Sequence, residues 1–280
     1  LDSGLSALWY SISSADNTSV PFISTDQQCG RLVYVSTTQI RLDPQDGNSI
    51  WVNTGSAWKR RLIPSAGITA ANTNIRIDGT SGQNLVANTL YWVHLFDNAG
   101  TLTIDFSSGT APAVDTTSGL KIKTGVASRA LIGMVRTNAS TPGQFQAGLV
   151  ASWYKRRKVM GSAALTTDRT RSETSATELH SEIRVEFLSW SEEAVLASYV
   201  GYAYTNTVTA SHTTSIYLNN LATLLSRTLA ETPTANLSDN VSQVASFSVS
   251  EGHHYVTVAG HVGAGTGHWP AGTLFVVTER

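Results

Sequence analysis

The sequence predicts an all-β protein. Apolar and polar residues alternate with a period of two in many short runs, the pattern of a strand with one buried face. Pairs of turn residues that end in glycine separate these runs, and glycine supplies the positive φ that tight hairpins need. Long stretches with helical periodicity are nearly absent. With 280 residues the chain can bury two separate cores.

The N-terminal part, residues 1–158, is predicted to be a β-rich attachment or shaft module. Three runs place their apolar side chains on one strand face: Val33 with Val35, Ile75 with Ile77, and Leu102 with Ile104 and Phe106. Turn pairs fall at Asp46-Gly47, Asp78-Gly79, Ala99-Gly100, Ser108-Gly109 and Pro142-Gly143. These positions favour hairpins between short strands.

Residues 159–181 contain few large apolar side chains and many Ser, Thr and charged residues. This composition predicts a linker between two domains. An extended strand that exchanges between subunits is the alternative interpretation.

Residues 182–280 are predicted to form a β-sandwich or jelly-roll-like domain. In residues 182–188 the apolar Ile183, Val185 and Phe187 alternate with charged residues, as on a half-buried strand. Further strands are expected at residues 195–204, 245–249, 255–262 and 274–278. Leucines spaced by three and four residues in the segment 216–229 predict a short helix, with a leucine-rich strand as the alternative.

Composition argues against several classes of partner. Charged residues make up 14% of the chain, the net charge is −1 and the pI is about 6.7, so no global field attracts nucleic acid or an anionic membrane. Cys29 is the only cysteine, which excludes an intrachain disulfide and a multi-thiolate metal site. No apolar run is long enough to span a bilayer, and the first residues, LDSGLSALWY, lack the features of a signal peptide. We expect no nucleic-acid partner and no membrane insertion.

Residues 120–157 carry a recognisable motif. Its residues are Gly125, Arg129, Leu131, Ile132, Gly133, Met134, Val135 and Arg136, followed by Ser152, Trp153, Tyr154, Arg156 and Arg157. The motif resembles a module of fibre and spike proteins of tailed bacteriophages. Residues 90–106 look like the hairpin that precedes it, so that the resemblance covers roughly residues 75–157.

The resemblance implies a virion appendage, a head or tail fibre or spike, that is assembled in the host cytoplasm and acts outside the cell. It implies a homotrimer whose partners are other virion structural proteins and a host surface polysaccharide. The motif residues are then expected to be structural. The basic cluster at residues 155–158 is expected to pair with acidic groups or cap the first domain.

No catalytic or metal site is predicted. His253, His254, His261 and His268 lie close in sequence, but their spacing does not match common zinc sites. We therefore expect no metal and no cofactor, and we interpret the glycine-rich residues 263–267 as a loop. No local pair of carboxylates suits glycan cleavage, and no G-x-S-x-G motif is present. The chain is predicted not to be an enzyme, although a polysaccharide depolymerase built from distant carboxylates is an alternative.

Aromatic residues of the C-terminal domain suggest a sugar-binding surface. The candidates are Trp190, Tyr202, Tyr204, His268 and Trp269, because flat rings stack on the apolar face of a pyranose. The alternative is that the tyrosines belong to the core. A different alternative for the whole chain is a purely structural decoration or connector protein of a virion.

Overall fold

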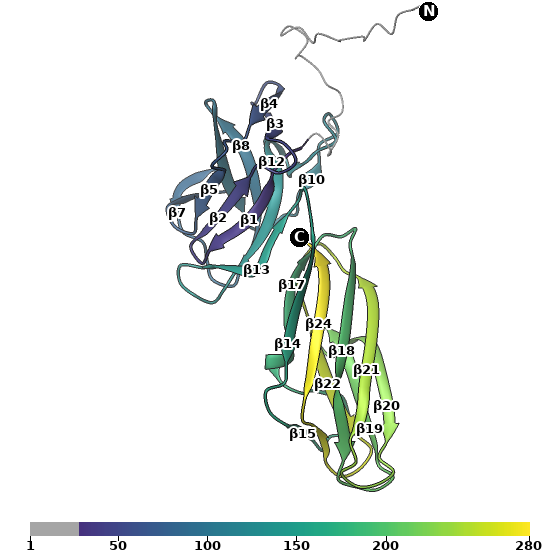
Figure 1. The fold of residues 1–280 in the computed structure, drawn as a ribbon. Coiled ribbons are helices and arrows are strands. Elements are labelled where there is room, and N and C mark those ends of the chain that lie inside the picture. Colours follow the sequence, from purple (N-terminus) through teal and green to yellow (C-terminus); the bar gives the residue numbers. More distant parts are fainter. Residues whose placement is uncertain (1–27) are drawn as a thin grey trace, which may run out of the picture.

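The computed structural model describes residues 28–280, and within that range it is built almost entirely of β-strands, as predicted. The predicted N-terminal features in LDSGLSALWY lie outside the described residues. Figure 1 shows two bodies, a compact N-terminal one and an elongated C-terminal one whose strands run along its length. Each has its own hydrophobic core, the first within residues 32–154 and the second within residues 165–276. In the described range, no helix has the length and apolar character to cross a membrane.

The first domain is organised around one large sheet. Strands β8 (Leu90–Asn98), β9 (Thr101–Ser107) and β12 (Val126–Thr137) lie at its centre, in the order β12-β8-β9. The same sheet contains β6 (Ile75–Ile77), β7 (Thr80–Gln83), β10 (Ala113–Val114), β11 (Lys121–Lys123) and β13 (Phe145–Ser152). A smaller sheet, β1-β2-β5, and the hairpin β3-β4 accompany it; their bounds are β1 (Arg31–Ser36), β2 (Gln39–Asp43), β3 (Ser49–Asn53), β4 (Trp58–Leu62) and β5 (Ile68–Ala71).

The core of this domain confirms two predicted strand faces and reverses a third. Ile75, Ile104 and Phe106 are buried together, as expected. On β1, however, Leu32 is buried and Tyr34 packs on the core, whereas Val35 is exposed. The prediction that Val33 and Val35 form the buried face of this strand was therefore wrong, because Leu32 and Tyr34 face the core instead. Alternation alone could not choose between the two faces because both carry large apolar side chains.

Glycines in this domain serve two different purposes. Asp78-Gly79 and Ala99-Gly100 have positive φ at both residues and connect strands in tight two-residue turns, as predicted. Gly143 instead allows close packing, because a Cβ there would lie 2.4 Å from the carbonyl oxygen of Val86. Gly133 of the motif has the same role: its Cβ would lie 2.4 Å from the carbonyl oxygen of Ala151.

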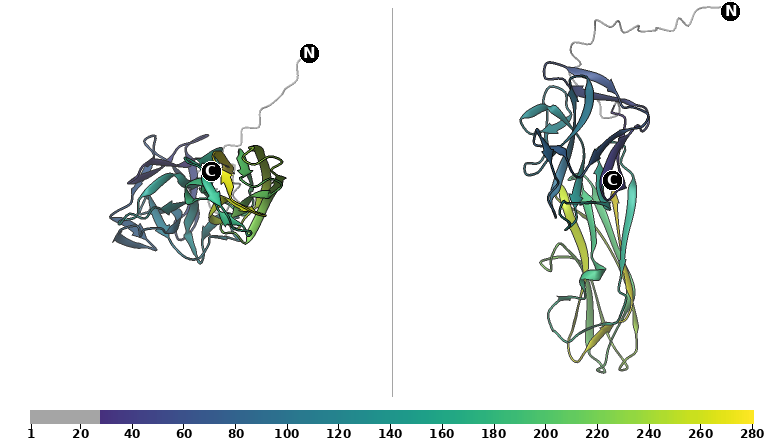
Figure 2. Two further views of the ribbon diagram at one scale, coloured as in Figure 1. Left: turned by 90° about the horizontal axis from the view of Figure 1, so that it is seen from below. Right: turned by 90° about the vertical axis from the view of Figure 1, so that its left-hand side faces the viewer.

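The second domain is a jelly roll. Two four-stranded antiparallel sheets have the orders β14-β24-β18-β21 and β17-β22-β19-β20, which is the strand order of two Greek keys folded together. The strands are β14 (Lys158–Ala164), β17 (Val185–Ser189), β18 (Ala194–Thr205), β19 (Ser211–Leu218), β20 (Thr223–Glu231), β21 (Asp239–Ser248), β22 (Gly252–Val262) and β24 (Gly272–Glu279), with short additions β15 (Arg169–Arg171), β16 (Thr177–Glu178) and β23 (Gly267–Trp269). Figure 2 shows the strands lying nearly along the long axis.

Two predictions for this domain need correction. Residues 159–181 do not form the predicted linker: β14 pairs with β24 of the same chain along its whole length, and β15 and β16 also join the sheets. Small residues there suit a sheet edge, so low hydrophobicity did not mean disorder. Residues 216–229 form the hairpin β19-β20 and not a helix. Of the leucines at helical spacing, Leu221 and Leu229 are exposed, so their spacing reflected no helical face and the alternative of a leucine-rich strand was correct.

A tryptophan cluster joins the two domains. Trp190, which follows β17, is fully buried against Trp92 of β8 and Trp153, with ring centroids 6.1 and 4.8 Å apart. The indole nitrogen of Trp190 donates a 3.2 Å hydrogen bond to the carbonyl of Ser152. Met134 and Leu188 belong to the same buried cluster, as do Leu131, Leu149 and Ala151. We call Trp92, Trp153, Trp190, Met134 and Leu188 the junction cluster.

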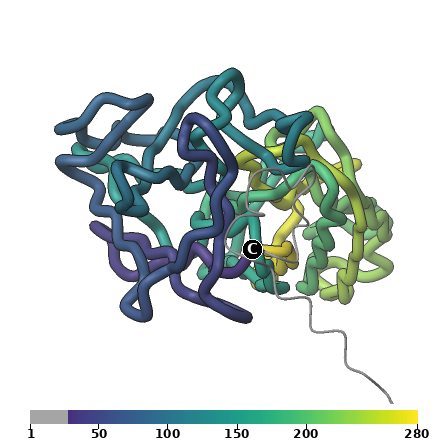
Figure 3. The backbone as a smooth tube through the Cα atoms, turned by 90° about the horizontal axis from the view of Figure 1, so that it is seen from above, coloured from purple at the N-terminus to yellow at the C-terminus, as the bar shows by residue number. Residues whose placement is uncertain are grey.

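Polar contacts surround the junction cluster. Lys121 of the first domain pairs with Glu251 of the second at 2.7 Å, and its ammonium lies 4.3 Å from the centre of the Trp153 ring. The backbones of Arg157 and Arg280 exchange two hydrogen bonds, which places the C-terminus between the domains (Figure 3). The two domains therefore share one packed interface.

We predict that Trp190→Ala lowers the free energy of unfolding by about 3–5 kcal/mol, because it empties a fully buried site and leaves the Ser152 carbonyl without its donor. Urea unfolding followed by tryptophan fluorescence and circular dichroism should show two separated transitions. Leu229→Ala, at an exposed leucine, should change stability by less than about 0.5 kcal/mol. Equal effects of the two substitutions would contradict the role of the junction.

The protein should also lose stability as the pH falls, because of His94. This histidine is buried on β8, and its Nε2 atom lies 2.9 Å from the Ser107 hydroxyl. Burial, together with the positive charges of Lys123 and Arg129, lowers the pKa of His94 from 6.5 to about 3. Between these values the unfolded chain binds the extra proton, so stability is lost as pH falls, by about 1.4 kcal/mol per unit for one histidine. His94→Gln should unfold with a visibly smaller loss between about pH 6.5 and 5 than the unsubstituted protein. Identical pH slopes would rule out this contribution.

Candidate functional site

Two of the five predicted sugar-binding residues are in the core. Trp190 belongs to the junction cluster, and Trp269 is fully buried inside the jelly roll, where its indole nitrogen donates a 2.8 Å hydrogen bond to the Thr214 hydroxyl. Neither ring is accessible to a ligand. Both predictions were wrong because a loop position suggested exposure, whereas large rings fill the ends of a sandwich core.

The other three residues share one surface. Tyr202 and Tyr204 of β18 point outward from the sheet, and Tyr204 pairs in register with His268 of β23. The two rings are stacked, with centroids 4.7 Å apart and planes inclined by 6°. Tyr202 lies two residues earlier on the same face and is 49% exposed. The alternative that the tyrosines belong to the core therefore fails for Tyr202.

Asp168 completes this surface, and the sequence did not single it out. Strand β15 pairs with β23, so that Thr170 lies opposite His268, and Asp168 immediately precedes β15. The Asp168 carboxylate is 2.7 Å from Nδ1 of His268. An ionised carboxylate only accepts hydrogen bonds, so Nδ1 carries the proton. We call Asp168, His268, Tyr204 and Tyr202 the Tyr–His face.

The Tyr–His face lies at the end of the jelly roll remote from the first domain, where β15 and the end of β18 are found (Figure 1). A neighbouring loop is held in place: the Asn206 N–H donates to the Thr266 carbonyl, and the Thr266 N–H donates to Oδ1 of Asn206. A Cβ on Gly265 would lie 2.1 Å from the Thr207 hydroxyl. The glycine-rich residues 263–267 are thus a tight connection, as the sequence indicated. An exposed phenol, a stacked ring pair and an oriented imidazole can stack on a ligand and hydrogen-bond to it.

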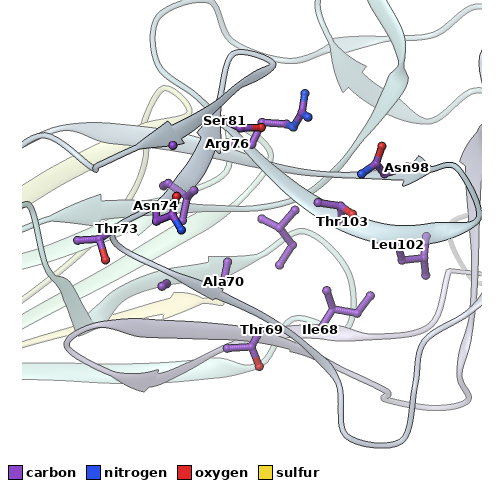
Figure 4. Close-up of a pocket in the computed structure, with 14 residues that line it drawn as sticks. Ile68, Thr69, Ala70, Thr73, Asn74, Arg76, Ser81, Asn98, Leu102 and Thr103 are labelled. Carbon is purple, nitrogen blue, oxygen red and sulfur yellow. The ribbon is translucent and has the colours of Figure 1, made fainter.

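A hollow lies in the first domain. It has a volume of about 360 Å³ and opens between β5 and β9 (Figure 4). Ile68, Ala70 and Leu102 contribute apolar surface, and its lining includes no Asp, Glu or His. The guanidinium of Arg76 donates a 2.6 Å hydrogen bond to the carbonyl of Gly79 and points away from Ile68 and Ala70 in Figure 4. This hollow offers no acid–base pair.

Carboxylates near the junction are occupied by structural contacts. Arg156 pairs with Glu193 at 2.8 Å and with Glu192 at 3.0 Å. Glu193 also accepts a hydrogen bond from the Trp190 backbone N–H. Burial raises the pKa of Glu193, an effect that the bond to Arg156 opposes. The cleft beside them also contains Lys158 and Glu279, but the most buried acid is tied to the turn after β17 and is not free to act as a general acid.

The basic cluster at residues 155–158 contacts acidic groups, as expected. Besides the two pairs of Arg156, Lys155 lies 3.8 Å from Asp46. The clustered histidines diverge: His254 is buried beside Asn219, His253 faces Glu186 and His268 belongs to the other sheet. Among residues 28–280, no three His, Cys, Asp or Glu side chains are placed to hold a metal ion.

Comparison with known proteins adds little to this geometry. No protein-family model matches the sequence, and no curated protein matches it. Among solved structures, the infectious bursal disease virus VP2 subviral particle aligns over 95% of this chain and 76% of its own, with 11% identity and a TM-score of 0.33. The Gt strain of infectious bursal disease virus aligns over 94% and 75%, with 13% identity and a TM-score of 0.35.

A β-porphyranase of glycoside hydrolase family 86 from Bacteroides plebeius aligns over 92% of this chain and 38% of its own, with 12% identity and a TM-score of 0.25. Scores this low carry no argument about function. A proposal about function therefore rests on the residues of this chain.

Proposed function

We propose that this chain is a non-enzymatic structural component of a virion, an appendage of the fibre or spike type that binds a host cell-surface glycan. The motif of residues 120–157, which resembles phage fibre modules, supports the first part of the proposal. Its residues make structural contacts: Arg129 pairs with Asp105 at 2.8 Å, and Arg156 and Trp153 hold the domain junction. The first domain then serves attachment and the second recognition.

The observation that carries glycan binding is the Tyr–His face. Tyr202 presents an exposed ring, and the stacked Tyr204 and His268 are held by Asp168 on three adjacent strands. Because strands hold these rings in place, binding a ligand costs little side-chain entropy. This low cost favours the binding of ligands that make only weak contacts, such as sugars. The Tyr–His face lies far from the first domain, so it stays accessible when the first domain is attached to the virion.

A structural connector is the second candidate function, and one observation favours it. The outer face of the sheet β14-β24-β18-β21 exposes Met160, Val200 and Val244, which are 62%, 55% and 62% exposed. Large apolar patches mark contacts with other proteins. A connector would use this face and would not bind cells.

The test is binding of labelled protein to intact candidate host cells before and after periodate oxidation of their surface glycans. We expect periodate-sensitive binding that Tyr204→Ala weakens about threefold to tenfold, since one stacking contact contributes about 0.5–1.5 kcal/mol. Tyr202→Ala should weaken it by a similar factor.

Tyr255→Ala is the matched control, because Tyr255 lies on the opposite sheet under the guanidinium of Arg184. It should leave binding unchanged. Absence of binding over a broad panel of hosts favours the connector. Periodate-sensitive binding that survives both substitutions on the Tyr–His face would place the glycan site elsewhere.

A further inference from the structure

We propose that the outer face of the sheet β14-β24-β18-β21 is an interface between two copies of this chain, related by a twofold axis parallel to the strands. Four adjacent strands expose apolar side chains on this face, where most of their neighbours are Ser, Thr and Ala and where Lys158 and Glu279 lie at one end. Figure 1 shows the four strands side by side. No other described part of the chain covers Met160, Leu196, Val200 or Val244, which are 43–62% exposed, and exposed apolar side chains that cluster in this way mark contact surfaces.

Strand register arranges this face in rows. One row is Met160, Val277, Leu196 and Ser246, and the next is Ser162, Phe275, Ser198 and Val244, each read from β14 across to β21. The axis of symmetry would run between β24 and β18, which contribute the two central residues of each row.

Rotation about that axis matches a large side chain with a small one in three of the four pairs and brings two apolar side chains together in the fourth. In the first row Met160 faces Ser246 of the other copy, and Val277 faces Leu196. In the second row Phe275 faces Ser198, and Val244 faces Ser162. A self-complementary patch of this kind is what an isologous interface requires, and sheets packed in this aligned way interdigitate their side chains.

Charges at the edge of the face are compatible with the same arrangement. The row nearest the first domain contains Lys158 and Glu279 on β14 and β24, and Ala194 and Ser248 on β18 and β21. Rotation places Lys158 opposite Ser248 and Glu279 opposite Ala194. No like charges face each other, so the patch is not protected against self-association.

The area of the face suits a weak dimer. Four strands spaced by about 4.8 Å, over the seven residues of β14 that rise about 3.3 Å each, cover about 450 Å² per copy. The total of about 900 Å² lies below the standard size of specific interfaces, in the range of weak and transient contacts. Association should therefore depend on protein concentration.

The arrangement has a consequence that rests on the proposed function. Because the axis is parallel to the strands, both copies place Tyr202, Tyr204 and His268 at the same end of the dimer. Two weak sites would then face one cell surface, which raises the effective affinity without any new contact.

Sedimentation velocity from about 1 to 100 μM tests the interface. We expect the chain to shift from monomer to dimer as concentration rises, and Leu196→Lys to remain monomeric at every concentration. Leu229→Lys is the matched control, because Leu229 is an exposed leucine on β20 of the opposite sheet; it should dimerise normally. Far-ultraviolet circular dichroism and melting temperature establish that both variants fold.

Ser198→Trp provides a second variant, since it keeps the face apolar but fills the space proposed for the partner's Phe275; it should also prevent dimerisation. A monomer at about 100 μM would overturn the proposal, and so would the homotrimer that the motif resemblance implies, if none of these substitutions changes its mass. Glycan binding by the monomeric Leu196→Lys protein separates the two ideas, because the Tyr–His face remains intact when the dimer is lost.

Discussion

The structure depends on the junction cluster. Leu188 and Trp190 lie at the end of β17, whose earlier residues Val185 and Phe187 belong to the jelly-roll core. One short strand therefore contributes to the core of its own domain and to the packing against the first domain. The burial of Trp92, Trp153 and Trp190 around it removes large apolar area from water. Because the contact includes ring packing, an ion pair between Lys121 and Glu251 and the backbone pair of Arg157 and Arg280, the two domains hold a defined mutual orientation. That orientation directs the Tyr–His face away from the first domain.

The jelly roll separates two kinds of surface along one sheet. The middle of its outer face is apolar, the end near the first domain carries Lys158 and Glu279, and the remote end carries Tyr202, Tyr204 and His268. Both surfaces lie on the outward face of β18, while its inward face packs into the core. The inner side is filled instead: Tyr199 packs where Gly201 and Gly272 leave room, since a Cβ on Gly272 would lie 2.0 Å from its hydroxyl. Because successive side chains of a strand point to opposite faces, a single sheet can stabilise the core with one face and contact partners with the other.

Prediction from sequence succeeded where local patterns were sufficient. Alternation located β18, β22 and β24, because a half-buried strand must place apolar residues at every second position. It failed on β1, whose two faces are both apolar, and on residues 216–229, where leucines at helical spacing lie on two strands of a hairpin. Asp168 was missed since its partner His268 lies 100 residues away, and only strand pairing brings them together.

The sequence by itself determined the all-β class, the turns at Asp78-Gly79 and Ala99-Gly100, and the sandwich character of the C-terminal half, because these follow from the preferences of neighbouring residues. Tertiary structure alone decided which aromatic rings are available. Trp190 and Trp269 look like surface residues in sequence but are buried, and Tyr202 is exposed although it lies in an apolar run. Burial depends on what packs against a residue, and in this chain those partners come from distant strands and from the other domain.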